Sequence, residues 1–522
     1  MAQNKANHNN TQTTAQRLRS VVKSARDIMR KDKGLSGDLD RLPALTWMMF
    51  LKFLDDLEQA RAMEAELEGS AFKPLIEPPY RWRDWAGAEK SLSGDDLMAF
   101  INNDEAMRPD GTRGAGLFAY LRGLDGRNGD PRRPVVATVF KGTLNRMING
   151  YLLRDVVNKI NEIHFDSSEE IHTLSHFYET MLREMRDAAG DSGEFYTPRP
   201  VVQFMVKVVD PRLGEVVYDP AAGTGGFLVE TYKHLEQQVK TIADRQTLQT
   251  GAIVGGEAKP LPYLLAQMNL LLHGLESPRI DPQNSLRHRL TDLGDRERVD
   301  VILTNPPFGG EEEQGIINNF PSDKQTAETA LLFLQLIMRK LRRPAAGQRG
   351  GRAAVVVPNG TLFADGLAAR IKEELLKGFN LHTIVRLPNG VFAPYTSIPT
   401  NLLFFERSGP TETIWYYEIP LPEGRKNYTK TKPMQVEDFA GCVEWWADRA
   451  ETDHAWPVAV EQVLQVDPAG NLLSVNLDVK NPNAADAIEH LPPEELVADI
   501  VKKERKILVL MEEIETALRE KT

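Results

Sequence analysis

The sequence has one cysteine, no excess of positive charge and no long apolar run. Each of these absences excludes or disfavours a class of protein. Cys442 is the single cysteine among 522 residues, so the chain has no internal disulfide and no cysteine-ligated zinc site. A mechanism that needs a cysteine nucleophile is also disfavoured. The formal net charge is -11, whereas a module that binds nucleic acid unaided needs clustered Lys and Arg. A nucleic-acid surface would therefore be local, or supplied by a partner.

Membrane and phosphate-binding signals are missing as well. No apolar run is long enough to cross a bilayer, and the first residues, MAQNKANHNNTQTTAQ, contain no hydrophobic signal core. We therefore expect a cytoplasmic protein without a membrane partner. The pattern G-x-x-x-x-G-K-[ST] is absent, which argues against an ATP-driven enzyme. No metal site is predicted.

What is present divides the chain into several expected domains, because 522 residues exceed one compact core. The polar stretch 1–16 is predicted to be disordered. Residues 17–165 show helical spacing of apolar residues and few strand signals, which indicates an α-helical domain for partner or DNA contact. Within it, the Gly- and Pro-rich stretch 109–134 is interpreted as an exposed connection between helices.

The carboxyl-terminal part is expected to end in a helix. Residues 431–490 form a mixed region without a clear pattern. Residues 491–522 place Ile500, Ile507 and Ile514 seven apart, which predicts a helix with one apolar seam. That seam would pack within the chain or bind a partner helix.

Residues 166–430 have the pattern of an α/β domain. From about residue 215, short apolar runs alternate with helical patterns, and the runs are EVVYD (215–219), AIVGGE (252–257), DVILT (300–304), RAAVVVP (352–358), LHTIVRLP (381–388) and TNLLFFE (400–406). This alternation predicts a Rossmann-like, doubly wound parallel sheet with ligands beyond the carboxyl ends of its strands. The last run follows a loop without a clear helix, so antiparallel pairing is expected there.

A glycine-rich turn follows the first run. In DPAAGTGGFL, Gly223, Gly225 and Gly226 allow a tight turn and a close approach of the backbone to a ligand. The pattern is not G-x-G-x-x-G, and the acidic residue that closes the next strand, Glu257, lies 38 residues after Asp219 rather than about 20. A carboxylate for ribose hydroxyls without a cationic phosphate grip suits an adenosine ligand that lacks phosphates. S-adenosylmethionine is the candidate.

The stretch DVILTNPPF ends a strand in an unusual corner. Two prolines remove backbone donors and fix the chain direction after Asn305, and an aromatic residue follows. Transfer of a methyl group to an exocyclic amine needs acceptors for the two amine hydrogens. The side-chain oxygen of Asn305 and the carbonyl oxygen of Pro306 can accept them, Pro307 makes the corner rigid, and Phe308 can stack on a planar base. The simpler explanation, a strand ended by proline, leaves these features unrelated.

These features together resemble the amino-group methyltransferases that act on adenine N6, most closely the modification subunit of type I restriction-modification systems. Three further stretches carry the resemblance: GEFYTPRPVVQFMV (193–206), RAAVVVPNGTLF (352–363) and IVRLPNGVFAPYTSIPTNLLFFER (384–407). The resemblance implies a class I S-adenosylmethionine-dependent methyltransferase fold. Residues 166–430 would be the catalytic domain, with an α-helical domain before it and a helical tail after it.

The resemblance also implies the site residues. The corner from Asn305 to Phe308, with both prolines, would be catalytic. Phe308 and Phe392 are candidates for stacking on the target base, although core packing is the more ordinary role of Phe392. The residues expected to bind the cofactor are Glu194, Phe195, Tyr196, Thr197, Pro198, Asp219, Ala221, Gly223, Thr224, Gly225, Glu257 and Asn284.

Three positions depart from the family pattern: Glu194, Ala222 and Asn284 stand where Gln, Cys and Asp are usual. An amide at position 284 can both donate and accept, so contact with the adenine ring of the cofactor survives the change.

Partners are implied as well. In such systems the modification subunit acts on double-stranded DNA in a bacterium or archaeon, and a separate specificity subunit reads the target, usually with two modification subunits to one. A restriction subunit that translocates DNA joins for cleavage. The helix over 491–522 would then contact the specificity subunit, and reliance on partners would explain the acidic chain. The target adenine must leave the base stack, which costs a few kcal/mol.

Other functions stay open. An asparagine-proline-proline-aromatic corner also serves methyltransferases that act on cytosine N4 or on a glutamine amide. A degenerate methyltransferase fold could serve as a DNA-binding scaffold, and a dinucleotide oxidoreductase is disfavoured by the incomplete fingerprint. The basic run Arg339–Arg352 is interpreted as favourable charge at a helix end, with DNA phosphate contact as the alternative.

Overall fold

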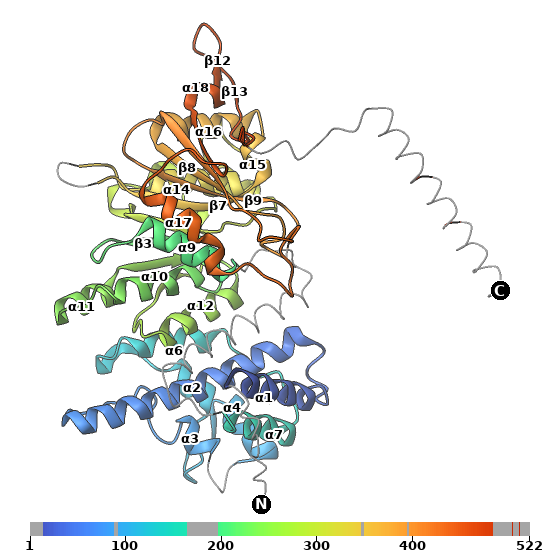
Figure 1. Cartoon of the computed structure of the whole chain (residues 1–522). Coiled ribbons are helices and arrows are strands. Elements are labelled where there is room, and N and C mark those ends of the chain that lie inside the picture. The colour runs from blue at the N-terminus through green and yellow to red at the C-terminus, as the bar shows by residue number, and fades with distance from the viewer. Residues whose placement is uncertain are drawn as a thin grey trace, which may run out of the picture.

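The computed structural model describes residues 14–87, 92–163, 197–345, 349–393 and 396–483, with the single residues 504 and 511. These residues form two lobes (Figure 1). The helical lobe comprises the described residues up to 163, and the sheet lobe those from 197 to 483. Most of the predicted disordered stretch 1–16, and the predicted helix over 491–522 apart from two single residues, lie outside the described residues.

The helical lobe is organised around one long buried helix. Residues 44–55 in the middle of α2 are buried on every side, as expected for a helix that is apolar all round. Trp47 of α2 packs edge to face against Phe118, with ring centroids 5.1 Å apart. The elements of the lobe are α1 (Thr14–Met29), α2 (Asp38–Glu68), α3 (Trp82–Trp85), α4 (Gly94–Asn102), β1 (Glu105–Met107), β2 (Arg113–Ala115), α5 (Leu117–Arg122), η1 (Gly126–Asn128), α6 (Arg132–Lys141) and α7 (Gly150–Asn161).

The interpretation of residues 109–134 as an exposed connection is wrong. This stretch contains β2, all of α5 and the start of α6. Leu117, Phe118 and Leu121 of α5 are buried in the core of the lobe. The apolar segment GLFAYL forms a helix because it can pack on α2, although Gly and charged residues surround it in the sequence.

The sheet lobe is built on nine strands in the order β11-β10-β8-β9-β7-β6-β3-β4-β5. Pairing among β3, β4, β5, β6 and β7 is parallel, and β9 pairs antiparallel with both β7 and β8. The predicted doubly wound sheet and its antiparallel last run are therefore confirmed. The strands are β3 (Val217–Asp219), β4 (Ile253–Gly256), β5 (Arg279–Asp281), β6 (Val301–Thr304), β7 (Arg352–Pro358), β8 (Asn380–Arg386), β9 (Thr400–Glu406), β10 (Thr413–Glu418) and β11 (Ala455–Ala459).

Three strands of this sheet were not predicted from the sequence: β5, β10 and β11. β5 has only three residues, two of them charged, so it carries no apolar run. β11 contains Pro457, which a strand tolerates at the sheet edge that β11 occupies. The sheet thus extends past residue 430, the expected end of the catalytic domain, because β11 pairs antiparallel with β10.

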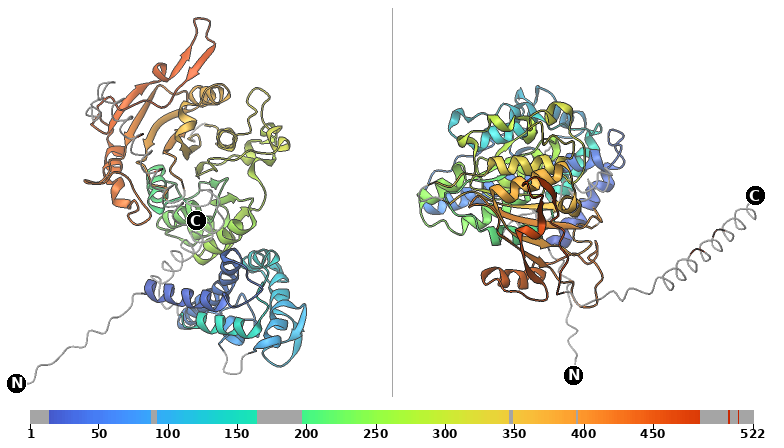
Figure 2. Two further views of the ribbon diagram at one scale, coloured as in Figure 1. Left: turned by 90° about the vertical axis from the view of Figure 1, so that its right-hand side faces the viewer. Right: turned by 90° about the horizontal axis from the view of Figure 1, so that it is seen from above.

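Helices cover both faces of the sheet (Figures 1 and 2). Along β7, Val355 and Val357 share a core with α14 and α16, whereas Ala354 and Val356 share a core with α9. The remaining elements of the sheet lobe are α9 (Arg199–Val209), α10 (Gly226–Glu236), α11 (Ile242–Thr250), α12 (Pro260–Leu272), η2 (Ser285–Arg287), η3 (Leu290–Asp292), η4 (Asp295–Glu297), α13 (Gln314–Ile317), α14 (Thr329–Lys340), α15 (Asn359–Phe363), α16 (Leu367–Gly378), η5 (Val436–Phe439), α17 (Ala440–Ala447), α18 (Val460–Val463), β12 (Leu464–Val466) and β13 (Leu472–Val475).

Helix α12 joins the two lobes. Leu265, Met268, Leu271 and Leu272 of α12 belong to the same buried core as α2 of the helical lobe. Tyr263, Ala266 and Leu270 of the same helix instead share a core with α10 and β4. Since α12 is apolar on both sides, the helical lobe packs directly beneath the helix that follows β4.

The basic run Arg339–Arg352 is largely engaged within its own lobe. Arg339 donates to the carbonyl oxygens of Leu290 and Leu293, at 2.8 and 2.7 Å. Arg352 pairs with Glu215, with 2.7 Å between Nη1 and Oε1. Packing thus accounts for these two arginines.

Among the described residues, no helix is long and apolar enough to cross a membrane.

Candidate active site

The carboxyl ends of four parallel strands bring the predicted site residues to one edge of the sheet. β3 lies between β4 and β6, so the chain runs outward from β3 in both directions. This reversal is the position where doubly wound sheets bind ligands. Asp219 ends β3, Glu257 follows β4, Asn284 follows β5 and Asn305 follows β6.

The glycine turn after β3 is fixed by hydrogen bonds to β4 and to the residue after it. Gly225 caps α10 with a φ of 80°, in the left-handed region that favours glycine. The backbone N–H of Ala222 donates to the carbonyl oxygen of Gly256 at 2.9 Å. The N–H of Gly223 donates to Oε2 of Glu257 at 2.8 Å. The turn and the acidic residue therefore form one structural unit.

Glu257 is largely buried, with 8% of its surface exposed. Its Oε1 accepts a 2.8 Å hydrogen bond from the N–H of Lys259. The carboxylate is thus oriented by backbone donors on both oxygens, and a carboxylate oxygen can accept more than one hydrogen bond. This position agrees with the predicted ribose contact, which stays a prediction.

Gly256 allows the close approach of the next loop to β4. A Cβ atom at this position would lie 2.2 Å from Oγ of Ser285. Ser285 in turn donates to the carbonyl oxygen of Pro220 at 2.7 Å. The loop after β5 therefore packs directly on the glycine turn.

Asp219 is fully buried where β3 meets β6. Its Oδ1 accepts hydrogen bonds from Oγ1 of Thr304, at 2.6 Å, and from the N–H of Ala221, at 3.1 Å. Burial raises the pKa of the Asp219 carboxyl to about 7, and these two hydrogen bonds only partly oppose that shift. The carboxyl thus ties the glycine turn to the residue before Asn305.

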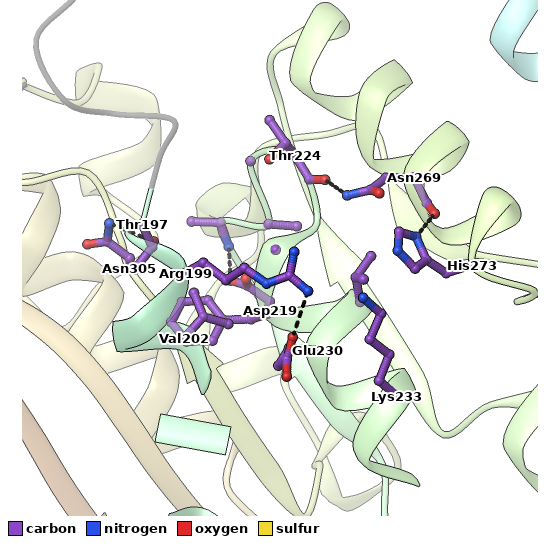
Figure 3. Close-up of a pocket in the computed structure, with 16 residues that line it drawn as sticks. Thr197, Arg199, Val202, Asp219, Thr224, Glu230, Lys233, Asn269, His273 and Asn305 are labelled. Atoms are coloured by element: carbon purple, nitrogen blue, oxygen red, sulfur yellow. Dashed lines mark hydrogen bonds and ion pairs between the residues drawn. The ribbon is translucent and has the colours of Figure 1, made fainter. Parts of the chain in front are cut away.

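Among the described residues, the side chain of Asn305 is held through its amide nitrogen. Nδ2 donates to Oγ1 of Thr197 at 3.0 Å (Figure 3). Its Oδ1 is buried and has no hydrogen-bond partner among the described residues. A buried acceptor without a donor costs about 1 to 3 kcal/mol, so an N–H donor of a ligand in the pocket would be a favourable partner for this atom.

The rest of the corner is partly enclosed. Pro306 is buried, whereas Pro307 and Phe308 keep some exposed surface. Phe308 packs edge to face against Phe392, with ring centroids 5.8 Å apart. Phe392 itself is 2% exposed and belongs to the core shared with α9. Of the two candidates for base stacking, Phe308 is thus the ring with accessible surface.

Asn284 lies at the start of η2. Its Oδ1 accepts from the N–H of Leu286 at 2.9 Å, and its Nδ2 donates to Oε2 of Glu312 at 3.3 Å. Burial raises the pKa of the Glu312 carboxyl, against the effect of this hydrogen bond. Glu312 comes from the loop after the corner and was not among the predicted residues.

One pocket adjoins the glycine turn and Asn305 (Figure 3). Thr197, Asp219, Ala221, Gly223, Thr224 and Asn305 of the predicted set line it. Polar residues that the sequence did not single out also line it: Arg199, Glu230, Lys233, Asn269 and His273. In the sequence, Glu230 and Lys233 are three residues apart on α10, and Asn269 and His273 are four apart at the end of α12, so each pair lies on one helix face. Only the tertiary packing shows that these two faces meet at the pocket.

Some predicted residues cannot be placed. Glu194, Phe195 and Tyr196 lie outside the described residues. Pro198 caps α9, directly after Thr197. Within the part of the chain that the structure describes, no group of three or more His, Cys, Asp or Glu could hold a metal ion.

Two family models match this chain. Residues 169–487 match the family model described as N-6 DNA methylase, and residues 18–160 match the HsdM N-terminal domain. The chain is 46% identical over 500 residues to the EcoEI type I restriction enzyme methylase subunit of Escherichia coli, across 94% of this chain and 95% of that protein. The chain belongs to the methylase subunits of type I restriction enzymes.

Solved structures agree with this assignment. A Vibrio vulnificus YJ016 protein described as a modification subunit of a type I restriction enzyme is 71% identical to this methylase subunit. It has a TM-score of 0.87 and covers 92% of this chain and 99% of its own. A chain from a study of type I restriction-modification complex assembly is 40% identical, with a TM-score of 0.70, and covers 98% of this chain and all of its own. The methylase subunit is thus a DNA methyltransferase with the class I fold.

Proposed function

We propose that this methylase subunit transfers a methyl group from S-adenosylmethionine to N6 of adenine in double-stranded DNA. The buried Oδ1 of Asn305, which lies beside the pocket and has no partner among the described residues, carries this proposal. An exocyclic amine brings two N–H donors, and one of them would complete the hydrogen bonding of Asn305. The carbonyl oxygen of Pro306, in a corner that two prolines make rigid, would accept the other.

These two acceptors would hold the two N6 hydrogens, so that the lone pair of N6 could point toward the methyl group. The N6 lone pair attacks the methyl carbon while the carbon–sulfur bond breaks, which leaves S-adenosylhomocysteine, and the surplus N6 proton passes to water. No covalent enzyme intermediate is required, which agrees with the burial of the single cysteine, Cys442.

The residues at the strand ends fit the cofactor. S-adenosylmethionine supplies an electrophilic methyl group on a sulfonium ion. The oriented carboxylate of Glu257 offers lone pairs for ribose hydroxyls, and the turn at Gly225 allows close backbone approach. Asp219, Ala221, Gly223 and Thr224 line the pocket beside it, Asn284 would face the adenine ring, and Pro198 with residues 194–196 would line the methionine end.

The target adenine must leave the base stack to reach Asn305, at a cost of a few kcal/mol. Phe308, partly exposed at the corner, would offset part of that cost by stacking on the flipped base. Phe392 would support the ring of Phe308 from the core.

Partners would supply target recognition. We propose that a specificity subunit reads the DNA sequence, with two methylase subunits to one, and that a restriction subunit joins the full complex. The type I names of the relatives and the structure from a type I assembly support partners in a type I complex. The net charge of -11 also favours DNA binding that depends on a partner.

The decisive experiment follows labelled methyl transfer from S-adenosylmethionine to unmethylated DNA, with the methylase subunit alone and with its specificity subunit. Hydrolysis of the DNA then identifies the modified base. We expect N6-methyladenine only when the partner is present. Label in cytosine would replace the proposed substrate, label in protein would move the reaction to a glutamine amide, and absence of cofactor binding would indicate a scaffold.

A further inference from the structure

Thr197 and Asn305 come from distant parts of the chain and meet at the pocket. They are 108 residues apart in sequence, and Nδ2 of Asn305 donates to Oγ1 of Thr197 at 3.0 Å. Each adjoins a buried element of the sheet lobe. Thr197 directly precedes Pro198, which caps α9, whose Val201 is fully buried, and Asn305 directly follows the buried strand β6.

An asparagine amide needs such a fixed contact to act as an acceptor. Rotation about its last torsion meets a broad, roughly two-fold energy profile, so an unrestrained amide turns readily. If the amide turned its NH2 group toward the substrate, donor would face donor and the amine would be repelled. The contact with the Thr197 hydroxyl restrains the plane of this amide, and in the observed orientation Nδ2 faces Thr197 while Oδ1 has no partner among the described residues.

We propose that Thr197 is a positioning residue for Asn305: its hydroxyl holds the amide so that Oδ1 faces the substrate amine. The inference rests on the proposed function, because it assigns the partner of the same catalytic oxygen. It gives Thr197 a role on the substrate side of the pocket, whereas the family resemblance implied a cofactor contact.

The hydroxyl of Thr197 could also hold an aspartate at position 305. A threonine hydroxyl can donate as well as accept, so it could also hold a carboxylate at position 305 by donating to one of its oxygens. The second carboxylate oxygen would then still accept from the amine. Asn305→Asp should therefore keep more activity than Asn305→Ala, and that advantage should depend on the hydroxyl of Thr197.

The test uses the full chain with its specificity subunit and unmethylated DNA. Thr197→Val keeps the shape of the side chain without the hydroxyl, and Thr197→Ser keeps the hydroxyl. We expect Thr197→Val to lower kcat by about 10- to 100-fold, the size of effect that a misplaced catalytic group produces. Thr197→Ser should restore most of the rate. The Kd for S-adenosylmethionine should stay within about twofold in both variants, because the cofactor carboxylate Glu257 and the glycine turn are unchanged.

A double-mutant cycle isolates the contact. Thr197→Val should have no further effect in an Asn305→Ala background, and it should remove the advantage of Asn305→Asp over Asn305→Ala. Thr138→Val is the matched control, since Thr138 donates from an exposed position on α6 to the carbonyl oxygen of Pro134. It should leave the rate unchanged.

Three outcomes would overturn the positioning role. Thr197→Val could keep the wild-type kcat, or it could weaken the affinity for S-adenosylmethionine while kcat at saturating cofactor is unchanged. The losses of Thr197→Val and Asn305→Ala could also prove additive in the double-mutant cycle. If Thr197→Val failed to fold, as a melting curve would show, the ratio of Asn305→Asp to Asn305→Ala activity in the wild-type background would decide. Equal activities would then reject the role. Failure of the proposed function itself would look different, because the wild-type complex would transfer no label.

Discussion

Thr304 and Asp219 join the ends of two neighbouring strands through a buried hydrogen bond. Oγ1 of Thr304 donates to Oδ1 of Asp219 at 2.6 Å, and both side chains are almost completely buried. Asp219 also accepts from the first residues of the glycine turn, while Thr304 directly precedes Asn305. This one contact therefore links the proposed cofactor turn to the proposed catalytic corner.

Thr304→Val should destabilise the protein by about 1 to 3 kcal/mol, because it keeps the shape but removes the donor to a buried carboxyl. Chemical denaturation measures the effect. Thr231→Val is the matched control: Thr231 is fully buried and its hydroxyl has no partner in the part of the chain that the structure describes, so the change should be neutral or stabilising. Equal losses for the two variants would show that the hydrogen bond contributes nothing.

Asp219→Asn should change how stability depends on pH. The pKa of Asp219 is raised from its ordinary value of 3.8 to about 7 by burial. Between these values the unfolded chain has lost the proton that the folded chain keeps, so this group lowers native stability by about 1.4 kcal/mol per pH unit as the pH rises. Above pH 7 the loss levels off.

The wild type should therefore lose stability relative to Asp219→Asn as the pH rises from 4 to 7, in urea titrations at several pH values. Asp292→Asn, at an exposed position of η3, is the control. A constant difference between wild type and Asp219→Asn across this range would mean that the buried carboxyl titrates normally.

Asn305→Ala should sharply reduce methyl transfer while the fold and cofactor binding persist. The change removes a buried acceptor at the pocket that has no partner among the described residues, and loss of a single such group typically lowers kcat by about 100-fold or more. Steady-state transfer, calorimetry with S-adenosylmethionine and thermal melting measure the three quantities. Asn318→Ala, at an exposed site, should change none of them. Retained transfer in Asn305→Ala would remove Asn305 from the mechanism.

Glu257→Ala should weaken S-adenosylmethionine binding by about 1 to 3 kcal/mol, as expected for a lost charged acceptor. It also removes the acceptor of the Gly223 and Lys259 N–H groups, so some loss of stability should accompany it. Glu257→Gln keeps an oxygen for one of these donors. Its loss of folding stability relative to the wild type should therefore be smaller than its loss of affinity for S-adenosylmethionine. Unchanged affinity in calorimetry for both variants would place the ribose elsewhere.

Gly256→Ala should destabilise the protein by about 1 to 3 kcal/mol, because the added Cβ would meet Oγ of Ser285 at 2.2 Å. Ser285→Ala in the same chain should recover part of that loss, since it removes the clashing atom. Gly142→Ala, where the added Cβ meets nothing within 4 Å, is the control. A Gly256→Ala protein as stable as wild type would show that the loop after β5 moves away freely.

Most of the sheet was readable from the sequence, for a physical reason. The runs 352–358 and 400–406 coincide with β7 and β9, because central strands buried on both faces need continuous apolar residues. β5 and the edge strand β11 lack that signal, since a short or edge strand is formed by its neighbours more than by its own residues. The segment GLFAYL was misread for a related reason, because its helix depends on packing against α2.

The candidate site divides in the same way. The residue types determined the glycine turn and the proline-stiffened corner, because backbone freedom and rigidity are local properties of Gly and Pro. Only the tertiary structure decided that Glu257 accepts from Gly223 and that Asn305 is held by Thr197, across 34 and 108 residues of chain. Such contacts depend on which strand ends become neighbours. That choice is made by packing on both sheet faces and on α12, and no local pattern encodes it.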